Sequence, residues 1–119
     1  MKYLALIYSA QNSGPIPGTP EFGEFMGGYQ NATQTYEKDG VLLAGEALED
    51  TSTATSIRIR DGKTETMDGP FAETKEQLGG FYMFECANID EAIKYAEMIP
   101  TAKYGTIEIR PIMDYSKLG

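Results

Sequence analysis

The chain has 119 residues, of which 41% are hydrophobic and 24% are charged. This length and balance are typical of one globular domain with a single core, and they exclude a disordered chain or two full-sized domains. Ten Lys and Arg residues against eighteen Asp and Glu residues give a net charge of -8. Such a surface repels phosphate backbones, and no run of basic residues offers a local exception, so we expect no nucleic-acid partner.

The residue types that are missing narrow the chemistry further. The sequence has no histidine and a single cysteine, Cys86. One chain therefore cannot hold a Ser-His-Asp triad, a Cys-His dyad, a histidine metal site or an internal disulfide. The apolar start over residues 1–8 is too short to cross a membrane, and no small-residue cleavage site follows it. We expect a cytoplasmic protein with no cofactor, no metal and no membrane contact.

The first third of the chain predicts a strand, a loop and a helix. Residues 2–8 are apolar on both alternating faces, which is typical of a central strand in a covered sheet. A loop rich in Gly and Pro follows over residues 9–18. Thr19 is the expected N-cap of a helix that has Pro20 at its first position. Apolar residues at helical spacing continue to Asp39-Gly40, where the glycine permits a left-handed end to the helix.

The middle of the chain predicts strands joined by a tight turn. Residues 41–48 form the second strand, and residues 56–60 alternate between isoleucine and arginine. Asp61-Gly62 is a two-residue hairpin turn because both positions tolerate a positive φ. The returning strand covers residues 64–68, and residues 72–77 are a polar loop or one helical turn.

The last third predicts a strand, a helix and a final strand. Residues 81–86 are again apolar on both faces. Asn88 and Glu91 have the spacing of a capping box, and a helical apolar stripe follows them until Pro100. Residues 106–112 form the last strand, with isoleucines on one face and charged residues on the other.

This order of elements predicts an α+β protein of the split βαβ, or ferredoxin-like, class with an inserted β-hairpin. Two helices cover only one face of such a sheet, yet two of its strands are apolar on both faces. A second copy of the chain is the simplest cover for the other face, so we predict a homodimer packed sheet to sheet. The polar groups of that interface would be Arg58, Arg60, Glu108 and Arg110.

The most distinctive segment runs from Asp68 to Gly80. Asp68 ends a strand and can accept hydrogen bonds from the turn that follows it, while Phe71 is expected to anchor the loop in the core. Composition alone favours a structural turn with a solvated helical cap at Glu73, Lys75 and Glu76. The functional alternative makes Asp68 a general acid/base or a substrate anchor, which would need partial burial or a nearby arginine.

This segment resembles the DGPF signature of the YCII-related proteins. The matching residues are Asp68-Gly69-Pro70-Phe71, Glu73-Thr74-Lys75-Glu76 and Gly79-Gly80. Shorter matches occur in the same order elsewhere, at Lys2-Tyr3, Gly40-Val41-Leu42, Gly45-Glu46, Thr55, Arg58, Arg60-Asp61-Gly62 and Ile107-Glu108-Ile109-Arg110-Pro111. The resemblance covers nearly the whole chain and implies a dimeric α+β barrel built by two subunits.

What the resemblance implies for function is limited. A His-Asp pair in a cleft has been proposed as catalytic in relatives, and Asp68 would match its Asp. No histidine is present to match the other member, so that dyad is excluded here. The resemblance also implies a regulatory link to extracytoplasmic sigma factors.

The remaining motifs favour structural roles. Gly62-Lys63-Thr64 lacks the first glycine of a phosphate-binding loop, because Ile57 stands in its place. Cys86 is expected to be a small buried hydrophobe. Three aromatic residues of the first helix are expected in the core: Phe22, Tyr29 and Tyr36. Three acidic residues near the second strand are expected in a solvated loop rather than around a cation: Glu46, Glu49 and Asp50.

Two functional hypotheses follow from the sequence. In the first, the protein binds a small ligand in a cleft between the sheet and the Asp68 loop, with Asp68 as acid/base or anchor, and could be a cofactor-free enzyme. The ligand, an anion in the simplest case, would be held by Arg58, Arg60, Arg110, Glu73 and Lys75. In the second, the protein is a non-catalytic dimeric module of a regulatory or stress pathway, and the loop is structural or contacts another protein.

Overall fold

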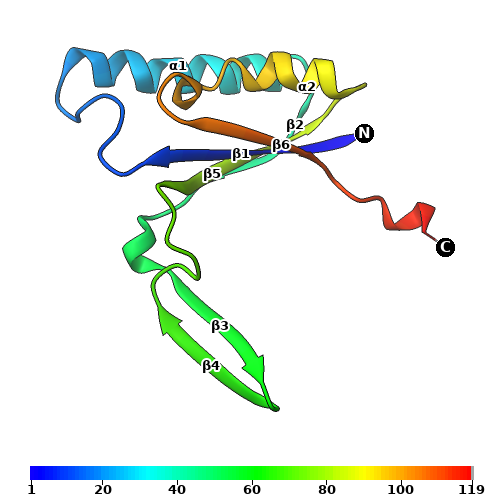
Figure 1. Cartoon of the computed structure of the whole chain (residues 1–119). Helices are drawn as coiled ribbons and strands as arrows, with labels where there is room; N and C mark the ends of the chain where they lie inside the picture. Colours follow the sequence, from blue (N-terminus) through cyan, green and yellow to red (C-terminus); the bar gives the residue numbers. More distant parts are fainter. Residues whose placement is uncertain (119) are drawn as a thin grey trace.

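The computed structural model describes residues 1–118 and contains a four-stranded antiparallel sheet covered by helices on one face (Figure 1). The strand order is β2-β5-β1-β6. The sheet strands are β1 (Lys2–Ala10), β2 (Leu42–Ala47), β5 (Glu76–Glu85) and β6 (Thr106–Pro111), and the helices are α1 (Pro20–Lys38) and α2 (Ile89–Ala96). A separate two-stranded sheet consists of β3 (Thr55–Arg60) and β4 (Lys63–Asp68). Short 3-10 helices are η1 (Thr51–Thr53), η2 (Pro100–Lys103) and η3 (Tyr115–Lys117).

The fold is α+β, and the strand order is that of a ferredoxin-like sheet. β1 and β5 occupy the two central positions. These are the two strands whose sequences are apolar on both faces, so the prediction that they lie inside the sheet is confirmed. β5 begins at Glu76, five residues earlier than the apolar run suggested, because Glu76 and Gln77 pair with the end of β1.

Both helices begin where their capping residues predicted. The Thr19 Oγ1 accepts a hydrogen bond from the Phe22 N–H at 3.3 Å, and the Asn88 Oδ1 accepts one from the Glu91 N–H at 3.0 Å. These bonds satisfy N–H groups that the first helical turn cannot pair internally. The first helix ends before Gly40, whose φ of +71° is the left-handed conformation that the sequence indicated.

The core lies between the helices and the sheet. Tyr36 of α1, Phe84 of β5 and Ile99, just after α2, are its largest fully buried side chains. The rings of Tyr36 and Phe84 meet edge to face with centroids 4.8 Å apart, a favourable geometry for aromatic quadrupoles. Cys86 is buried in the same cluster, as the sequence predicted.

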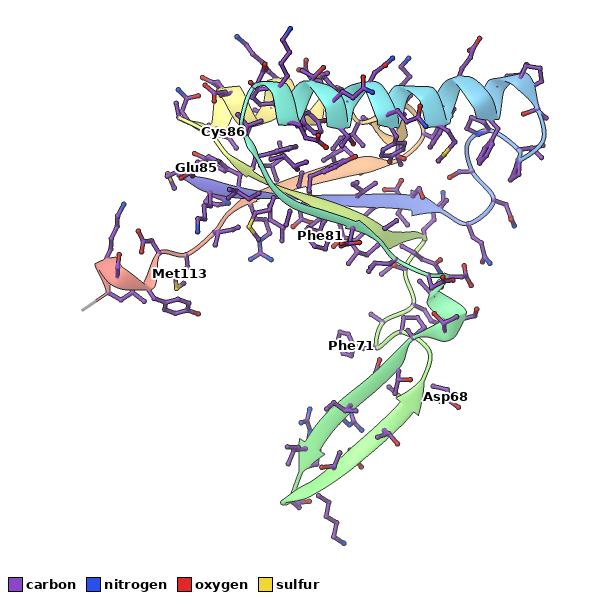
Figure 2. The ribbon with its side chains drawn as sticks, turned by 180° about the vertical axis from the view of Figure 1, so that it is seen from behind. Asp68, Phe71, Phe81, Glu85, Cys86 and Met113 are labelled. Atoms are coloured by element: carbon purple, nitrogen blue, oxygen red, sulfur yellow. The ribbon has the colours of Figure 1, made fainter. Side chains whose placement is uncertain are left out.

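Within residues 1–118, no helix covers the other face of the sheet, which we call the open face (Figure 1). Alternation along β1 places Tyr3, Ala5 and Ile7 under the helices and the residues between them on the open face. The pairing of β1 with β5 then gathers six partly exposed apolar side chains there: Leu4, Leu6, Tyr8, Leu78, Phe81 and Met83. Figure 2 shows Phe81 pointing away from the helix layer.

The β3–β4 hairpin extends away from the main sheet (Figure 1). Its turn, Asp61-Gly62, has φ angles of +53° and +73°, as the two-residue hairpin turn requires. The radius of gyration of the chain is 16.6 Å, against about 13.5 Å for a compact domain of this length. The excess comes from the β3–β4 hairpin, which we call the arm. The main sheet of its own chain does not cover this arm.

Candidate functional site

The end of β4 places Asp68 in solvent. Asp68 is exposed, and the turn that follows it is fixed by Gly69 instead. The Gly69 N–H donates to the Ala54 carbonyl oxygen at 2.6 Å, and the Gly69 carbonyl oxygen accepts from the Ser56 Oγ at 2.9 Å. The φ of Gly69 is +94°, which side chains other than glycine rarely adopt. The backbone of Gly69 therefore anchors the turn to β3.

The prediction that Phe71 anchors the loop in the core is wrong. Its side chain is 84% exposed and points away from the loop in a different direction from Asp68 (Figure 2). Phe71 is exposed because its loop joins the projecting hairpin to β5. The loop therefore passes outside the helix-covered core.

Phe71 instead lines a cleft beside the loop, which we call the loop cleft. The volume of this cleft is about 530 Å³, within the range of small-molecule sites. It lies between the sheet end at Tyr8 and Leu78, the segment after β2, and residues 70–74 of the loop. The residues that line it are Tyr8, Leu48, Glu49, Asp50, Thr51, Thr53, Ala54, Pro70, Phe71, Ala72, Thr74, Gln77 and Leu78. Most of these side chains are apolar, and the charged ones are acidic.

The arginines predicted to hold a ligand lie apart within one chain. Arg58 pairs across the hairpin with Glu65, Nε to Oε1, at 2.7 Å. The Arg60 Nη1 donates to the Ile59 carbonyl oxygen at 2.9 Å. Arg110 lies on β6, opposite Leu4 of the open face. In a single chain, the hairpin arginines are therefore on a different part of the molecule from the sheet arginine.

The two other predicted ligand contacts, Glu73 and Lys75, are exposed on the loop. Neither lines the loop cleft, whose loop wall is made by their neighbours Ala72 and Thr74. A site that used Glu73 or Lys75 would therefore lie at the outer side of the loop. Among residues 1–118, no group of three or more Cys, Asp or Glu side chains is arranged to hold a metal ion.

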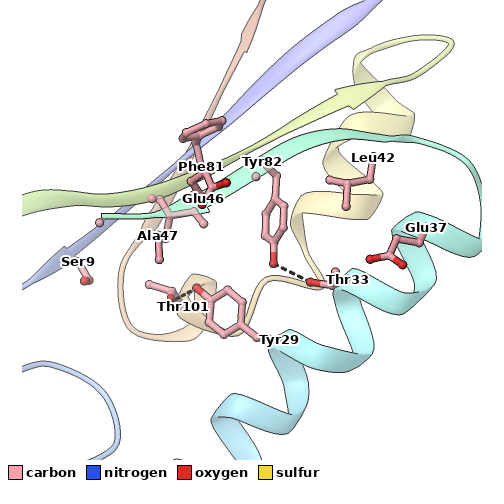
Figure 3. A pocket seen from close by; sticks show the side chains of 14 residues that line it. Ser9, Tyr29, Thr33, Glu37, Leu42, Glu46, Ala47, Phe81, Tyr82 and Thr101 are labelled. Carbon is pink, nitrogen blue, oxygen red and sulfur yellow. Dashed lines mark hydrogen bonds between the residues drawn. The ribbon is translucent and has the colours of Figure 1, made fainter. Parts of the chain in front are cut away.

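A second cavity lies between α1 and the β2 edge of the sheet, and we call it the helix–sheet pocket (Figure 3). Its volume is about 540 Å³. Ile7, Leu42 and Ala47 supply apolar walls, and glycine backbone of β2 and β5 supplies part of the floor. Five hydroxyl groups also line it: those of Ser9, Tyr29, Thr33, Tyr82 and Thr101. The sequence interpretation missed this pocket.

Four of these hydroxyls form two hydrogen-bonded pairs (Figure 3). The Tyr29 and Thr101 oxygens are 2.6 Å apart, and the Thr33 and Tyr82 oxygens are 3.0 Å apart. Burial raises the pKa of the Tyr29 phenol above its ordinary value, so this group is neutral at physiological pH. In each pair one hydroxyl donates to the other, which leaves one proton and several lone pairs for a ligand.

The lack of a side chain at Gly45 makes room for the Tyr82 ring. A Cβ at Gly45 would lie 2.7 Å from the Tyr82 Cδ1, closer than atoms can approach. Glycine at this position of β2 therefore lets the ring lie against the strand beside it and carry its hydroxyl to Thr33.

Only some of the residues that line this pocket could have been grouped from the sequence. Tyr29, Thr33 and Glu37 are four residues apart in turn, so they share one side of α1. The sequence interpretation placed Tyr29 in the core, and the structure shows a half-buried ring with a hydroxyl at the cavity wall. Its partner Thr101 is 72 residues away in the chain, beyond the reach of any local pattern.

Comparison with known proteins shows the family of this chain. The sequence model of the YCII-related domain matches residues 1–116. An uncharacterised protein of Rhizobium meliloti (strain 1021) is 36% identical over 117 residues, which cover 97% of this chain and 94% of the relative. The chain therefore belongs to the YCII-related family. No helix within residues 1–118 has the length and apolar character needed to cross a bilayer.

Proposed function

We propose that this protein is a homodimer that binds a small ligand in the loop cleft. The observation that carries the proposal is the amount of apolar surface that one chain leaves exposed on the hairpin, the loop and the open face. Ile57 is 69% exposed, Ile59 is 64% exposed and Phe71 is 84% exposed. Apolar side chains gathered in this way are typical of a surface that another protein covers.

A second copy is the partner that best fits this surface. The open face offers half-buried leucines and aromatic rings, while the hairpin offers exposed isoleucines on an arm that projects from the sheet. If the arm of one copy packs against the open face of the other, both surfaces become buried. A two-fold axis repeats this contact, so the arm and the open face of each copy are covered. This packing would also make the assembly more compact than the extended single chain.

The dimer would complete the ligand site. Tyr8 and Leu78 belong both to the loop cleft and to the open face, so the cleft is continuous with the surface that the second copy would cover. Arg58 and Arg60 alternate with the isoleucines along β3, so they would point away from the covered open face and hold an anionic group at the rim of the contact rather than beside Arg110. Asp68 would act beside them as an anchor or as an acid/base, and the protein would be a cofactor-free enzyme in that case.

The exposure of Phe71 also favours a second candidate function. An aromatic side chain at the tip of a loop is a common anchor in protein contacts. In this alternative the protein is a non-catalytic dimeric module, and the loop contacts another protein of a regulatory or stress pathway, such as one linked to sigma factors. No ligand would then respond to changes at Asp68.

A thermal-shift screen tests the ligand part of the proposal. Wild type and Asp68→Asn are compared against a panel of small carboxylates and phosphates, with Asp61→Asn as the matched control at the far end of the hairpin. A ligand at a hundredfold its dissociation constant stabilises the folded protein by about 2.7 kcal/mol, which raises the midpoint by several degrees. We expect a stabilising ligand for wild type and Asp61→Asn that has no effect on Asp68→Asn.

Two results separate the alternatives. A ligand that stabilises all three proteins equally would remove Asp68 from the site. The absence of any stabilising anion, together with capture of one specific protein by wild type and its loss in Phe71→Ala, would favour the non-catalytic module. Light scattering on the same samples reports the dimer independently of any ligand.

A further inference from the structure

We propose that the helix–sheet pocket binds a small monoamine, in which a primary ammonium group is joined to a body about the size of one aromatic ring. The pocket lies on the helix-covered face of the sheet, whereas the loop cleft opens toward the other face. This second site therefore does not depend on the dimer or on the Asp68 loop. Its volume of about 540 Å³ is ample for such a molecule.

The charge of the pocket selects the class of ligand. Among the described residues that line it, the charged ones are Glu37 and Glu46, and none is a lysine or arginine. In Figure 3 the Glu37 carboxylate points toward the pocket, while Glu46 lies with Phe81 on the opposite face of the sheet. A single carboxylate at the rim favours one positive charge on the ligand and disfavours a carboxylate or phosphate.

The remaining walls fit an apolar body with few polar atoms. The rings of Tyr29 and Tyr82 stand on two sides of the cavity, with Leu42 beside them (Figure 3). Aromatic rings bind apolar groups, and their faces also attract a cation. The hydroxyl pair of Thr33 and Tyr82 lies one helical turn from Glu37 and can accept a further ammonium proton.

The pocket is open without any rearrangement of the fold. Part of its strand wall is made by small residues: Gly45 and Ala47 on β2, and Gly79 and Gly80 on β5. Ala47 is exposed on the edge strand, and in Figure 3 its methyl group points into the cavity. A larger side chain at position 47 would therefore fill the cavity from its rim.

Three molecules of one shape and different charge test the proposal. Benzylamine, benzyl alcohol and benzoate are titrated into the full chain, and binding is followed by backbone amide shifts in NMR spectra. For a ligand of this size we expect a dissociation constant on the order of 1 mM for benzylamine. Benzyl alcohol should bind about two- to fivefold more weakly, because it lacks the ion pair with Glu37. Benzoate should not bind in the pocket, and the shifts should centre on Gly45, Gly80 and Thr101.

Two variants and one control fix the location. Glu37→Gln should remove the preference for benzylamine over benzyl alcohol, and Ala47→Leu should abolish binding of both. Glu24→Gln, an exposed change on the same helix outside the pocket, should leave the affinities for benzylamine and benzyl alcohol unchanged. Both positions 37 and 47 are exposed, so the variants should keep the dispersed spectrum of the folded protein.

Four outcomes would overturn the proposal. The first is no binding of benzylamine at a concentration about ten times the expected dissociation constant, and the second is binding of benzoate as tight as that of benzylamine. The third is a preference for benzylamine over benzyl alcohol that survives Glu37→Gln, and the fourth is binding that survives Ala47→Leu. None of them bears on the loop cleft, because its anion screen depends on Asp68 and not on Glu37.

Discussion

The Tyr36 hydroxyl donates a hydrogen bond to the Tyr95 carbonyl oxygen at 2.6 Å, and this bond joins the last turn of α1 to the last turn of α2. Tyr36 is fully buried, with its ring edge against Phe84. The bond therefore fixes the packing of the two helices at the middle of the core.

We expect Tyr36→Phe to lower the free energy of unfolding by about 1 kcal/mol, near the lower end of the range for a buried bond. The loss is limited because the Tyr95 carbonyl oxygen also accepts a bond from the Met98 N–H at 3.1 Å. Urea unfolding measures the change, and Tyr115→Phe is the matched control, since Tyr115 is 77% exposed. Equal effects of the two substitutions would contradict a structural role for the bond.

Stability should fall in alkaline solution because of the buried phenols. Burial raises the pKa of both Tyr29 and Tyr36 above the ordinary value of 10.0. A raised folded-state pKa means that the unfolded chain loses these protons first. The stabilisation is therefore complete below about pH 10 and is lost as the pH rises through the folded-state values.

Urea unfolding at about pH 8 and about pH 11 measures this loss. The decline should be smaller in Tyr29→Phe, which cannot ionise at that position, and unchanged in Tyr115→Phe. A decline of the same size in all three proteins would assign the alkaline instability to other groups.

Cys86 should be inert toward thiol reagents while the protein is folded. Its side chain is 4% exposed, and burial raises the pKa of the thiol, with the Glu91 carboxylate adding to the effect. The reactive thiolate is therefore both scarce and covered. We expect one thiol to react quickly with a disulfide reagent in strong urea and very slowly without it. Rapid reaction of the folded protein would show that the edge of the core near Cys86 opens easily.

Local patterns in the sequence predicted most of the fold. Caps at Thr19 and Asn88 and the turn at Asp61-Gly62 act within a few residues, so their sequence signals are sufficient. The two strands that are apolar on both faces could be placed at the centre of the sheet, because such sequences are typical of interior strands in a covered sheet.

The candidate sites could not be predicted in the same way. Phe71 looked like a core residue because an aromatic side chain favours burial, but the direction of its loop depends on the projecting hairpin. The helix–sheet pocket needs Tyr29 and Thr101 together, and only the tertiary fold brings them within 2.6 Å. Any meeting of Arg58 with Arg110 depends on a second chain.

The exposed face of the hairpin gives the most direct test of the proposed homodimer. We expect Ile59→Lys to weaken dimerisation at least about tenfold, because a charge buried in an apolar interface without a partner costs several kcal/mol. Ile59 is 64% exposed in the single chain, so the substitution should leave the fold of each subunit intact. Light scattering across a dilution series measures the dissociation constant, and circular dichroism checks the fold.

The matched control for this prediction is Ile93→Lys. Ile93 is 41% exposed on α2, in the helix layer and away from the hairpin and the open face. This variant should therefore dimerise like the wild type. A monomeric wild type at all concentrations would contradict the dimer, and equal weakening by both lysines would move the interface away from the hairpin. Weakening by Ile59→Lys alone would place the hairpin in the contact between the two copies.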